Sequence, residues 1–341
     1  MKWTLVCLVL LTAVSCKPAS SGSQKRPAPS ESSQAVGSEL QAPTARRLFA
    51  PSIGGQPVLA GVSYGPFREG QRPGGADPSP DQILEDLQIL ASRWGMIRIY
   101  SSRGPAEVIL RTIKEQDIPL RLMLGVWIAR DDPQANAAEV REGIRLANAF
   151  PAQVLAVSVG NETQVEWSGH RSSLESLVGH IRTVRSSVVQ PVSTADDYNF
   201  WNKPVSQVVA DEVDFLLLHA YAMWNQQTLE NAVPWTASTL KSIRAVHPEL
   251  PIVLGETGWA TLLNPDGDEV KYIKAPAGVA EQTAFYADFT AWAASEALPY
   301  FYFEAFDEPW KGSDHPAEVE KHWGLYTEKR EAKAGPMGAL R

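Results

Sequence analysis

Two glutamates in this sequence each follow a short apolar run that is typical of a buried strand. Glu256 comes after residues 251–254 with only a glycine between, and Glu162 comes after residues 154–159 with Gly160 and Asn161 between. Such a carboxylate either caps a helix, pairs with an arginine or carries out chemistry. Two carboxylates flanking one bond suit glycoside hydrolysis, because one protonates the leaving oxygen while the other attacks or activates water.

Other polar residues near these glutamates favour chemistry over packing. Asn161 directly precedes Glu162 and could hydrogen-bond a sugar hydroxyl, and Tyr221 follows a predicted strand and could hold a carboxylate nucleophile in place. His219 lies two residues before Tyr221, but no second ligand stands at metal-binding spacing. We therefore predict a hydrogen-bonded histidine of the core or the site wall, with no metal and no cofactor.

Short apolar runs alternate with longer amphipathic stretches from about residue 57 onward. The predicted strands are 58–64, 96–100, 120–127, 154–159, 192–195, 213–219, 252–254 and 300–306. The predicted helices are 81–93, 106–115, 135–149, 174–188, 236–246 and 280–295. Eight strands alternating with helices predict a single-domain α/β fold, the (β/α)8 TIM barrel. A doubly wound open sheet is the alternative, but no glycine-rich nucleotide-binding motif follows the first strand.

The barrel places Glu162 and Glu256 at the carboxyl ends of its fourth and seventh strands, where catalytic residues of this fold lie. Tryptophans also follow strand ends, and sugars stack on such rings. Trp310 and Trp259 stand beside polar strand-end motifs, so we expect both to contact substrate. The other tryptophans at strand ends, for which substrate contact and packing are equally plausible, are Trp127, Trp167, Trp201, Trp224 and Trp323. Asp196 and Asp197 are either cleft carboxylates or a helix cap, with substrate contact weakly favoured.

Five motifs in order along the chain resemble those of glycoside hydrolase family 17, the β-1,3-glucanases and related glucanosyltransferases. They are GVSYG (61–65), IRIYSS (97–102), VGNE (159–162), GETGW (255–259), and AFDEPWK (305–311) with HWGLY (322–326). The loop after GETGW departs from plant members, with Ala260 and Thr261 in place of Pro-Ser.

The resemblance implies a role for each matching residue. Glu162 would be the general acid/base and Glu256 the nucleophile of a retaining double displacement, whose carboxyl oxygens lie about 5–5.5 Å apart, against about 6.5–9.5 Å in inverting enzymes. Asn161 would bind the substrate hydroxyl beside the anomeric carbon, and Tyr221 would position Glu256. The remaining substrate-binding residues would be Tyr64, Arg98 and Tyr100 on the floor, and Glu308 and Lys311 in the eighth-strand loop.

The first 48 residues are predicted to lie outside the fold. Residues 1–15 have the charged start and apolar stretch of a signal peptide, and the small residue before Cys16 resembles a lipoprotein cleavage box. An ordinary signal peptide is the alternative. Residues 16–48 would be a lipidated cysteine and a flexible linker rich in Ser, Pro and Ala, and residues 49–341 the catalytic barrel.

These features predict an exported lipoprotein anchored in the bacterial cell envelope, at the outer membrane or the periplasmic face. The net charge of −8 argues against a nucleic-acid partner. The expected partner is β-glucan, cleaved within the chain by a monomeric enzyme. A β-1,3-glucanosyltransferase using the same glycosyl-enzyme is one alternative, and a non-catalytic glucan-binding lipoprotein is another.

Overall fold

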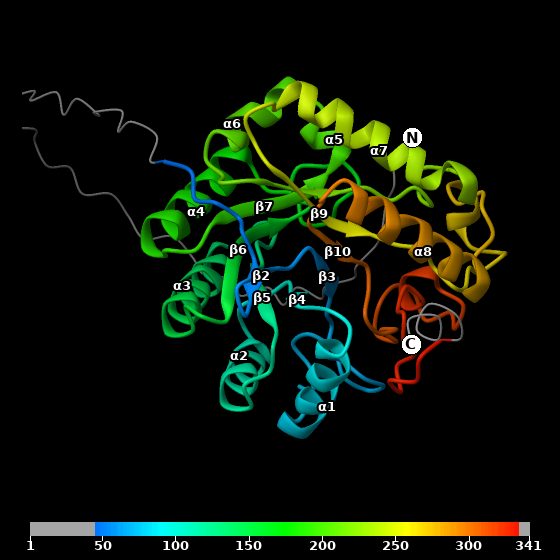
Figure 1. Cartoon of the computed structure of the whole chain (residues 1–341), viewed down its shortest axis with the longest axis horizontal. Coiled ribbons are helices and arrows are strands. Elements are labelled where there is room, and N and C mark those ends of the chain that lie inside the picture. Colours follow the sequence, from blue (N-terminus) through cyan, green and yellow to red (C-terminus); the bar gives the residue numbers. More distant parts are fainter. Residues whose placement is uncertain (1–44, 334–341) are drawn as a thin grey trace, which may run out of the picture. The chain divides into compact units, whose positions relative to one another are not determined.

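Eight parallel strands close into a barrel in the computed structural model, which describes residues 45–333. The strands run around the barrel in the order β10-β3-β4-β5-β6-β7-β8-β9, with the helices arranged around them (Figure 1). Their bounds are β3 Ala60–Ser63, β4 Met96–Arg98, β5 Arg121–Val126, β6 Val154–Asn161, β7 Val192–Asp197, β8 Leu216–His219, β9 Ile252–Thr257 and β10 Tyr300–Tyr302. The predicted (β/α)8 barrel is confirmed. The predictions for residues 1–44 lie outside the described residues.

Three of the long outer helices begin at side-chain caps. Their bounds are α1 Pro80–Ala91, α2 Ala106–Glu115, α3 Pro133–Ala149, α4 Leu174–Ser187, α5 Tyr198–Trp201, α6 Gln207–Ala210, α7 Leu229–Val246 and α8 Val279–Ser295. Ser79 caps α1 in a capping box with Gln82, Asp132 caps α3, and Ser173 caps α4. Within residues 45–333, none of the helices combines the length and apolar character that crossing a membrane requires.

Helix α7 begins seven residues earlier than position 236, where the sequence pattern predicts it. Pro234 lies inside the helix, and a proline normally marks a helix start because it lacks an N–H donor. The structure accommodates it near the N-terminus of the helix, and buried Ala232 holds the extra turn against the core. Between β7 and β8 the chain forms only α5, the 3₁₀ turn Pro204–Ser206 and α6.

The barrel interior holds one cluster of apolar side chains. Its members are Phe49, Met96, Met123, Ala156, Ala195, Phe215, Leu217, Val253 and Phe301. All but Phe49 come from the barrel strands or, for Phe215, the residue before β8. The Phe49 ring packs against Phe215 with centroids 4.8 Å apart, so Phe49 plugs the end at which the strands begin. The short hairpin of β1 Ser52–Ile53 and β2 Gln56–Pro57 follows it.

The chain is fixed to the barrel before it reaches Phe49. Arg47 donates from its guanidinium to the carbonyl oxygens of Gln190 and Arg185, and its backbone N–H donates to Asp214. Asp214 is buried and also pairs with Arg185 at 2.8 Å. The described end of the predicted linker, residues 45–48, is therefore bound to the barrel.

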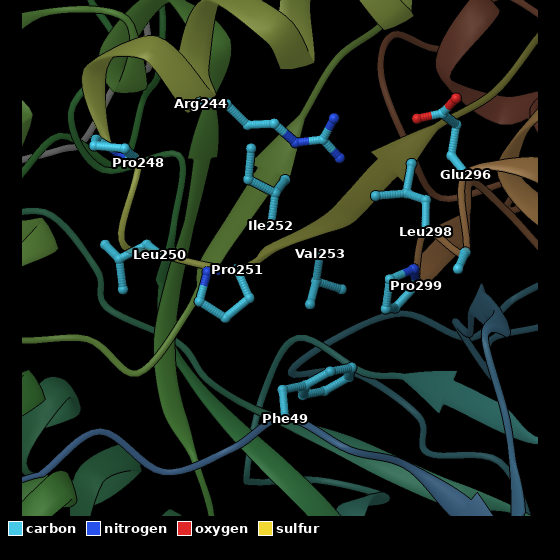
Figure 2. A pocket seen from close by; sticks show the side chains of 11 residues that line it. Phe49, Arg244, Pro248, Leu250, Pro251, Ile252, Val253, Glu296, Leu298 and Pro299 are labelled. Atoms are coloured by element: carbon cyan, nitrogen blue, oxygen red, sulfur yellow. The ribbon is translucent and has the colours of Figure 1, made fainter.

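A pocket of about 510 Å³ lies at this same closed end. Its lining comes from Phe49 and from the segments that lead into β9 and β10, including Pro251 and Pro299 (Figure 2). Both segments precede their strands, so the pocket lies at the opposite end of the barrel from the side chains that follow the strands.

Candidate active site

Glu256 lies near the carboxyl end of β9 and is almost enclosed, with 6% of the residue exposed. Its Oε1 accepts hydrogen bonds from Arg98 Nη1 and the Tyr100 hydroxyl, each at 2.8 Å. Its Oε2 accepts from the Tyr221 hydroxyl at 2.7 Å. Two tyrosines and one guanidinium thus fix both oxygens of this carboxylate.

These donors decide the charge of Glu256. Burial by itself favours the neutral acid, but the neighbouring His219 ring and the Arg98 guanidinium favour the carboxylate. The hydroxyls of Tyr221 and Tyr100 add hydrogen bonds to the ionised form, and the pKa of Glu256 falls below its usual value. The group is therefore a carboxylate at neutral pH, as a nucleophile must be.

The backbone at the end of β6 turns sharply to present Glu162. Gly160 has φ +81° and Glu162 has φ +50°, a left-handed conformation that is uncommon outside glycine. The Glu162 N–H donates to the Ala195 carbonyl at 2.8 Å, which holds the turn against β7. The Glu162 side chain keeps 26% of its surface exposed and meets His219 Nδ1 through Oε1 at 2.9 Å.

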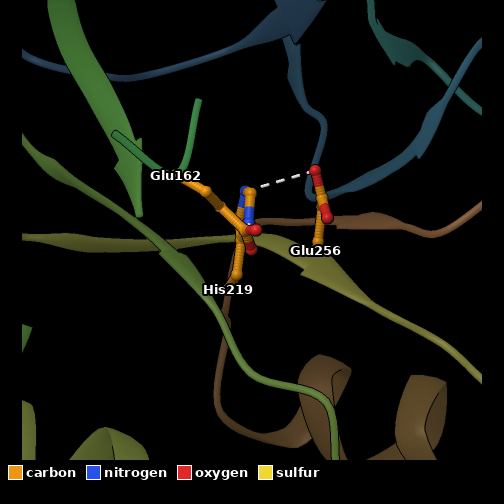
Figure 3. A group of neighbouring side chains, drawn as sticks. All are labelled: Glu162, His219 and Glu256. Carbon is orange, nitrogen blue, oxygen red and sulfur yellow. Dashed lines mark hydrogen bonds and ion pairs between the residues drawn. The ribbon is translucent and has the colours of Figure 1, made fainter. Parts of the chain in front are cut away.

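His219 lies between the two glutamates, as Figure 3 shows. Its ring is fully buried, and its Nε2 lies 3.3 Å from Glu256 Oε1 and 3.1 Å from Arg98 Nη1. One oxygen of Glu162 and one of Glu256 lie within 4.8 Å of each other. This separation is close to that of a retaining pair and far below that of an inverting pair, which must admit a water between the carboxylates.

The atoms of this trio are spaced as metal ligands would be, but the Arg98 guanidinium already contacts two of its members. Its guanidinium contacts Glu256 at 2.8 Å, His219 at 3.1 Å and, through Nη2, the Asn161 side-chain oxygen at 2.7 Å. Because a second cation here would face this fixed positive charge, the contacts favour an ion-paired carboxylate site over a metal site.

A second charged cluster follows β10. Lys311 Nζ contacts the two Glu304 oxygens at 2.9 and 2.8 Å and Glu308 at 2.6 Å. Burial raises the pKa of Glu304 well above its usual value, and the charge of Glu308 adds to the shift. The pKa of Glu308 is lowered: burial opposes ionisation, but the Lys311 ammonium and a hydrogen bond with Glu304 outweigh it. Glu304 therefore holds the proton.

Close packing explains one glycine in each of two motifs. A Cβ at Gly65 would lie 2.0 Å from a Glu308 oxygen, so GVSYG leaves room for the charged cluster. A Cβ at Gly258 would lie 2.0 Å from the Phe303 carbonyl oxygen, so the second glycine of GETGW lets the chain pass β10.

Several predicted substrate-binding residues keep part of their surface exposed. Asn161 directly precedes Glu162, Tyr100 binds Glu256, and Lys311 lies in the cluster after β10; all three are half-buried. Tyr221 holds Glu256, as the resemblance implies. Trp310 is 39% exposed, with its Nε1 donating to Glu308 at 2.9 Å and its ring edge-on to Phe67. Its free surface is available to a ligand.

Two other residues predicted to contact substrate are buried and point away from the two glutamates. Trp259 is fully buried against Phe285 and donates to the Pro276 carbonyl, because the chain turns outward after β9. Tyr64 is 1% exposed, and its hydroxyl donates to Asp86 instead of facing the cleft.

Arg98 and Glu308 are likewise enclosed, with 1% and 2% exposed. Arg98 binds Glu256 and Glu308 binds Lys311, and the contact of these two side chains with substrate stays a prediction.

The remaining strand-end tryptophans divide by burial. Trp201 and Trp323 are buried, and Trp224 is half-buried against Trp323. Trp127 is half-buried with its ring 4.5 Å from that of His170 at 68°, and Trp167 is 62% exposed. Trp127 follows β5, and Trp167 follows β6, the strand that leads to Glu162.

The paired aspartates at the end of β7 are buried. Asp197 is the N-cap of α5 and accepts from the Asn199 backbone, while Asp196 accepts from the N–H groups of Gln164 and Asp197. Burial raises the pKa of Asp197 to about 6. Of the two alternatives left open by the sequence, these contacts support the helix cap.

Two carboxylates near the site escaped the sequence analysis. Glu304 is fully buried under Lys311, and Glu320, in the 3₁₀ turn Val319–Lys321, is half-buried. Burial raises the pKa of Glu320 to about 7, and the charges of Glu162 and Glu256 add to the shift. The sequence could have indicated Glu304, because this residue directly follows the apolar run 300–303, much as Glu162 and Glu256 follow apolar runs.

Comparison with known proteins supports the motif assignment. Residues 61–324 match the model of the BtgE/BtgC glycoside hydrolase domain. A glucan 1,3-beta-glucosidase of Arthroderma benhamiae is 27% identical over 280 residues, covering 77% of this chain and 86% of that protein.

Solved structures share the fold. An endo-laminarinase from Formosa Hel1_33_131 superposes with a TM-score of 0.74 at 25% identity, covering 83% of this chain and 86% of that one. A glycoside hydrolase family 17 beta-1,3-glucanosyltransferase from Rhizomucor miehei superposes with a TM-score of 0.68 at 24% identity, covering 82% and 96%. The chain therefore belongs to the BtgE/BtgC glycoside hydrolase family, and the family resemblance drawn from its motifs is confirmed.

Proposed function

We propose that this protein is a retaining glycosidase that hydrolyses β-1,3-glucan within the chain. The observation that carries the proposal is the pair of carboxylates within 4.8 Å, one buried and held ionised, the other half-exposed. The names of its relatives, glucan 1,3-beta-glucosidase and endo-laminarinase, support β-1,3-glucan such as laminarin as the substrate.

The geometry fits a double displacement. In the first step a Glu256 oxygen bonds to the anomeric carbon while the glycosidic C–O bond breaks, and Glu162 transfers its proton to the leaving oxygen. In the second step Glu162 takes a proton from water, whose oxygen bonds to the anomeric carbon while the bond to Glu256 breaks. Arg98, Tyr100 and Tyr221 hold Glu256 in place for both steps.

A glucanosyltransferase would differ only in the second step, where a sugar hydroxyl replaces water. Laminari-oligosaccharides labelled at the reducing end separate the two activities. Only shorter products indicate hydrolysis, whereas products longer than the substrate indicate transfer. Labelled fragments of intermediate length early in the reaction indicate cleavage within the chain.

Two variants test whether the protein is catalytic at all. Glu256→Ala is expected to abolish turnover while glucan binding persists, and Glu162→Ala is expected to slow cleavage most for poor leaving groups. A protein that binds laminarin but turns nothing over, with or without Glu256, would be a non-catalytic glucan-binding protein and would refute the proposal.

We also propose that the chain is exported, cleaved before Cys16 and lipidated there, and that it works as a monomer in the cell envelope. The signal-like residues 1–15 and the linker composition support this proposal. Radiolabelled palmitate should enter the wild-type protein in a bacterial host and not the Cys16→Ala variant. Light scattering of the detergent-solubilised protein should give the mass of one chain plus its detergent.

A further inference from the structure

We propose that His219 positions the general acid/base by binding one oxygen of Glu162 and leaving the other to carry the catalytic proton. The inference rests on the proposed function and adds a residue to it. His219 ends β8, and its fully buried ring lies between Glu162 and Glu256 (Figure 3). It joins groups from three other strands or strand ends. Those groups are Arg98 from β4, Glu162 after β6 and Glu256 from β9.

Arg98 fixes which ring nitrogen of His219 carries the proton. A guanidinium only donates hydrogen bonds, and Arg98 Nη1 lies 3.1 Å from His219 Nε2. Arg98 Nη1 also donates its two hydrogens toward the Gly255 carbonyl and Glu256, so the His219 contact shares one of them, and these contacts hold the guanidinium in place. A proton on Nε2 would face this donor, so Nε2 presents its lone pair and the proton lies on Nδ1.

The proton on Nδ1 then points at Glu162 Oε1, 2.9 Å away. Among residues 45–333, His219 is the one hydrogen-bond partner recorded for the Glu162 side chain. Oε1 is therefore occupied as an acceptor, and a protonated Glu162 carries its hydrogen on Oε2. The same oxygen gives up a proton in the first step and receives one in the second.

His219 also lies 3.3 Å from Glu256 Oε1, so a role on the nucleophile is the rival explanation. In that arrangement Nε2 would carry the proton and donate to Glu256. Leaving-group dependence separates the two roles: loss of the acid slows substrates that need protonation, whereas loss of the nucleophile slows every substrate.

The side-chain amides of asparagine and glutamine allow a matched test. The Asn nitrogen occupies about the place of imidazole Nδ1, and the Gln nitrogen about that of Nε2. We compare wild type, His219→Ala, His219→Asn and His219→Gln by kcat/KM on laminarihexaose and on 2,4-dinitrophenyl β-laminaribioside, whose leaving group needs no proton. Circular dichroism and thermal unfolding verify the fold. Should His219→Ala not fold, the Asn and Gln variants carry the comparison.

We expect His219→Ala to lower kcat/KM on laminarihexaose about 100-fold, because general acid catalysis is impaired. On the activated substrate, which needs no proton, kcat/KM should change only about threefold. His219→Asn should restore most of the loss and His219→Gln should not. Adding His219→Ala to Glu162→Gln should cost little more, since both remove one function. Equal losses on both substrates, or rescue by Gln instead of Asn, would overturn the inference. A wild type that cleaves neither substrate would instead refute the proposed function.

Discussion

At the scale of single residues, the site separates its two glutamates by environment. Glu256 is enclosed and receives three hydrogen bonds, whereas Glu162 is partly exposed and meets His219 alone among its described partners. Carboxyl groups acquire different roles when their surroundings favour different charge states. Here Arg98 pairs directly with Glu256, whereas it is linked to Glu162 only through His219.

The Tyr221 hydroxyl should help set the acid limb of the pH profile. Its hydrogen bond stabilises ionised Glu256, so Tyr221→Phe removes a cause of the lowered pKa and that pKa rises. Less Glu256 is then ionised in acid, and the acid limb of kcat/KM against pH moves to higher pH. Tyr198→Phe, whose hydroxyl binds Asn225, is the matched control and should leave the limb in place. An acid limb unchanged in Tyr221→Phe would contradict this account.

At the scale of elements, the loop after β10 is built around a buried charge. Lys311 is the shared partner of Glu304 and Glu308, and removing one partner of a buried ion pair typically costs about 3–5 kcal/mol. Lys311→Met should lower the free energy of unfolding at pH 7 by about that amount. The cost should shrink at pH 5, because the variant has to protonate both carboxyls to bury them.

Urea unfolding at the two pH values measures this difference. Lys271→Met is the control, because its ion pair with Asp268 is exposed to solvent and contributes little to stability. A Lys311→Met penalty no larger than that of the control would contradict a buried ion pair between Lys311 and Glu308.

The loops after β5 and β6 place two rings beside Glu162. Trp127 and His170 meet edge to face, which leaves part of the half-exposed indole free. If the leaving sugar stacks there, Trp127→Ala should raise the KM for laminarihexaose about tenfold, equivalent to about 1.4 kcal/mol, with kcat changed by about twofold at most. Trp292→Ala on the outer helix α8 should leave KM unchanged. A kcat loss with constant KM would contradict a binding role.

Sequence predicts the elements of this fold better than the direction of its side chains. Barrel strands are enclosed on both sides, so each forms a continuous apolar run that ends at polar residues, as before Glu162 and Glu256. Beyond a strand end, side chains no longer alternate regularly between the two faces of the strand. Residues that are close in sequence can then point to different parts of the molecule. Trp259 lies three residues after Glu256 yet packs outward on α8, which no local pattern indicates.

Local rules also fail where tertiary contacts outweigh them. Pro234 lies inside α7 although its pattern predicts a later start, and Arg47 in the predicted linker binds the barrel through Asp214. Networks of hydrogen-bonded polar side chains are even harder to predict from sequence. That Arg98 joins Glu256, His219 and Asn161 depends on four different strands meeting, which is a property of barrel closure.

At the scale of the whole molecule, the two ends of the barrel have different tasks. The glutamates lie where the strands end, and the N-terminal segment reaches the barrel where the strands begin. Arg47 and Phe49 fasten that closed end by hydrogen bonds and by packing. Stability and activity should therefore respond separately to substitutions at the two ends, as in other barrels of this kind.

Phe49→Ala tests that separation. The Phe49 ring fills the closed end against Phe215, and truncating a buried phenylalanine costs about 3–5 kcal/mol. Urea unfolding should show a lower midpoint with an unchanged slope, while kcat and KM at 25 °C stay at wild-type values because the glutamates lie at the other end. Leu48→Ala, one residue away but 76% exposed, should change neither property. A Phe49→Ala variant that keeps its stability, or one that remains folded but loses activity, would show that the closed end does not act as an independent plug.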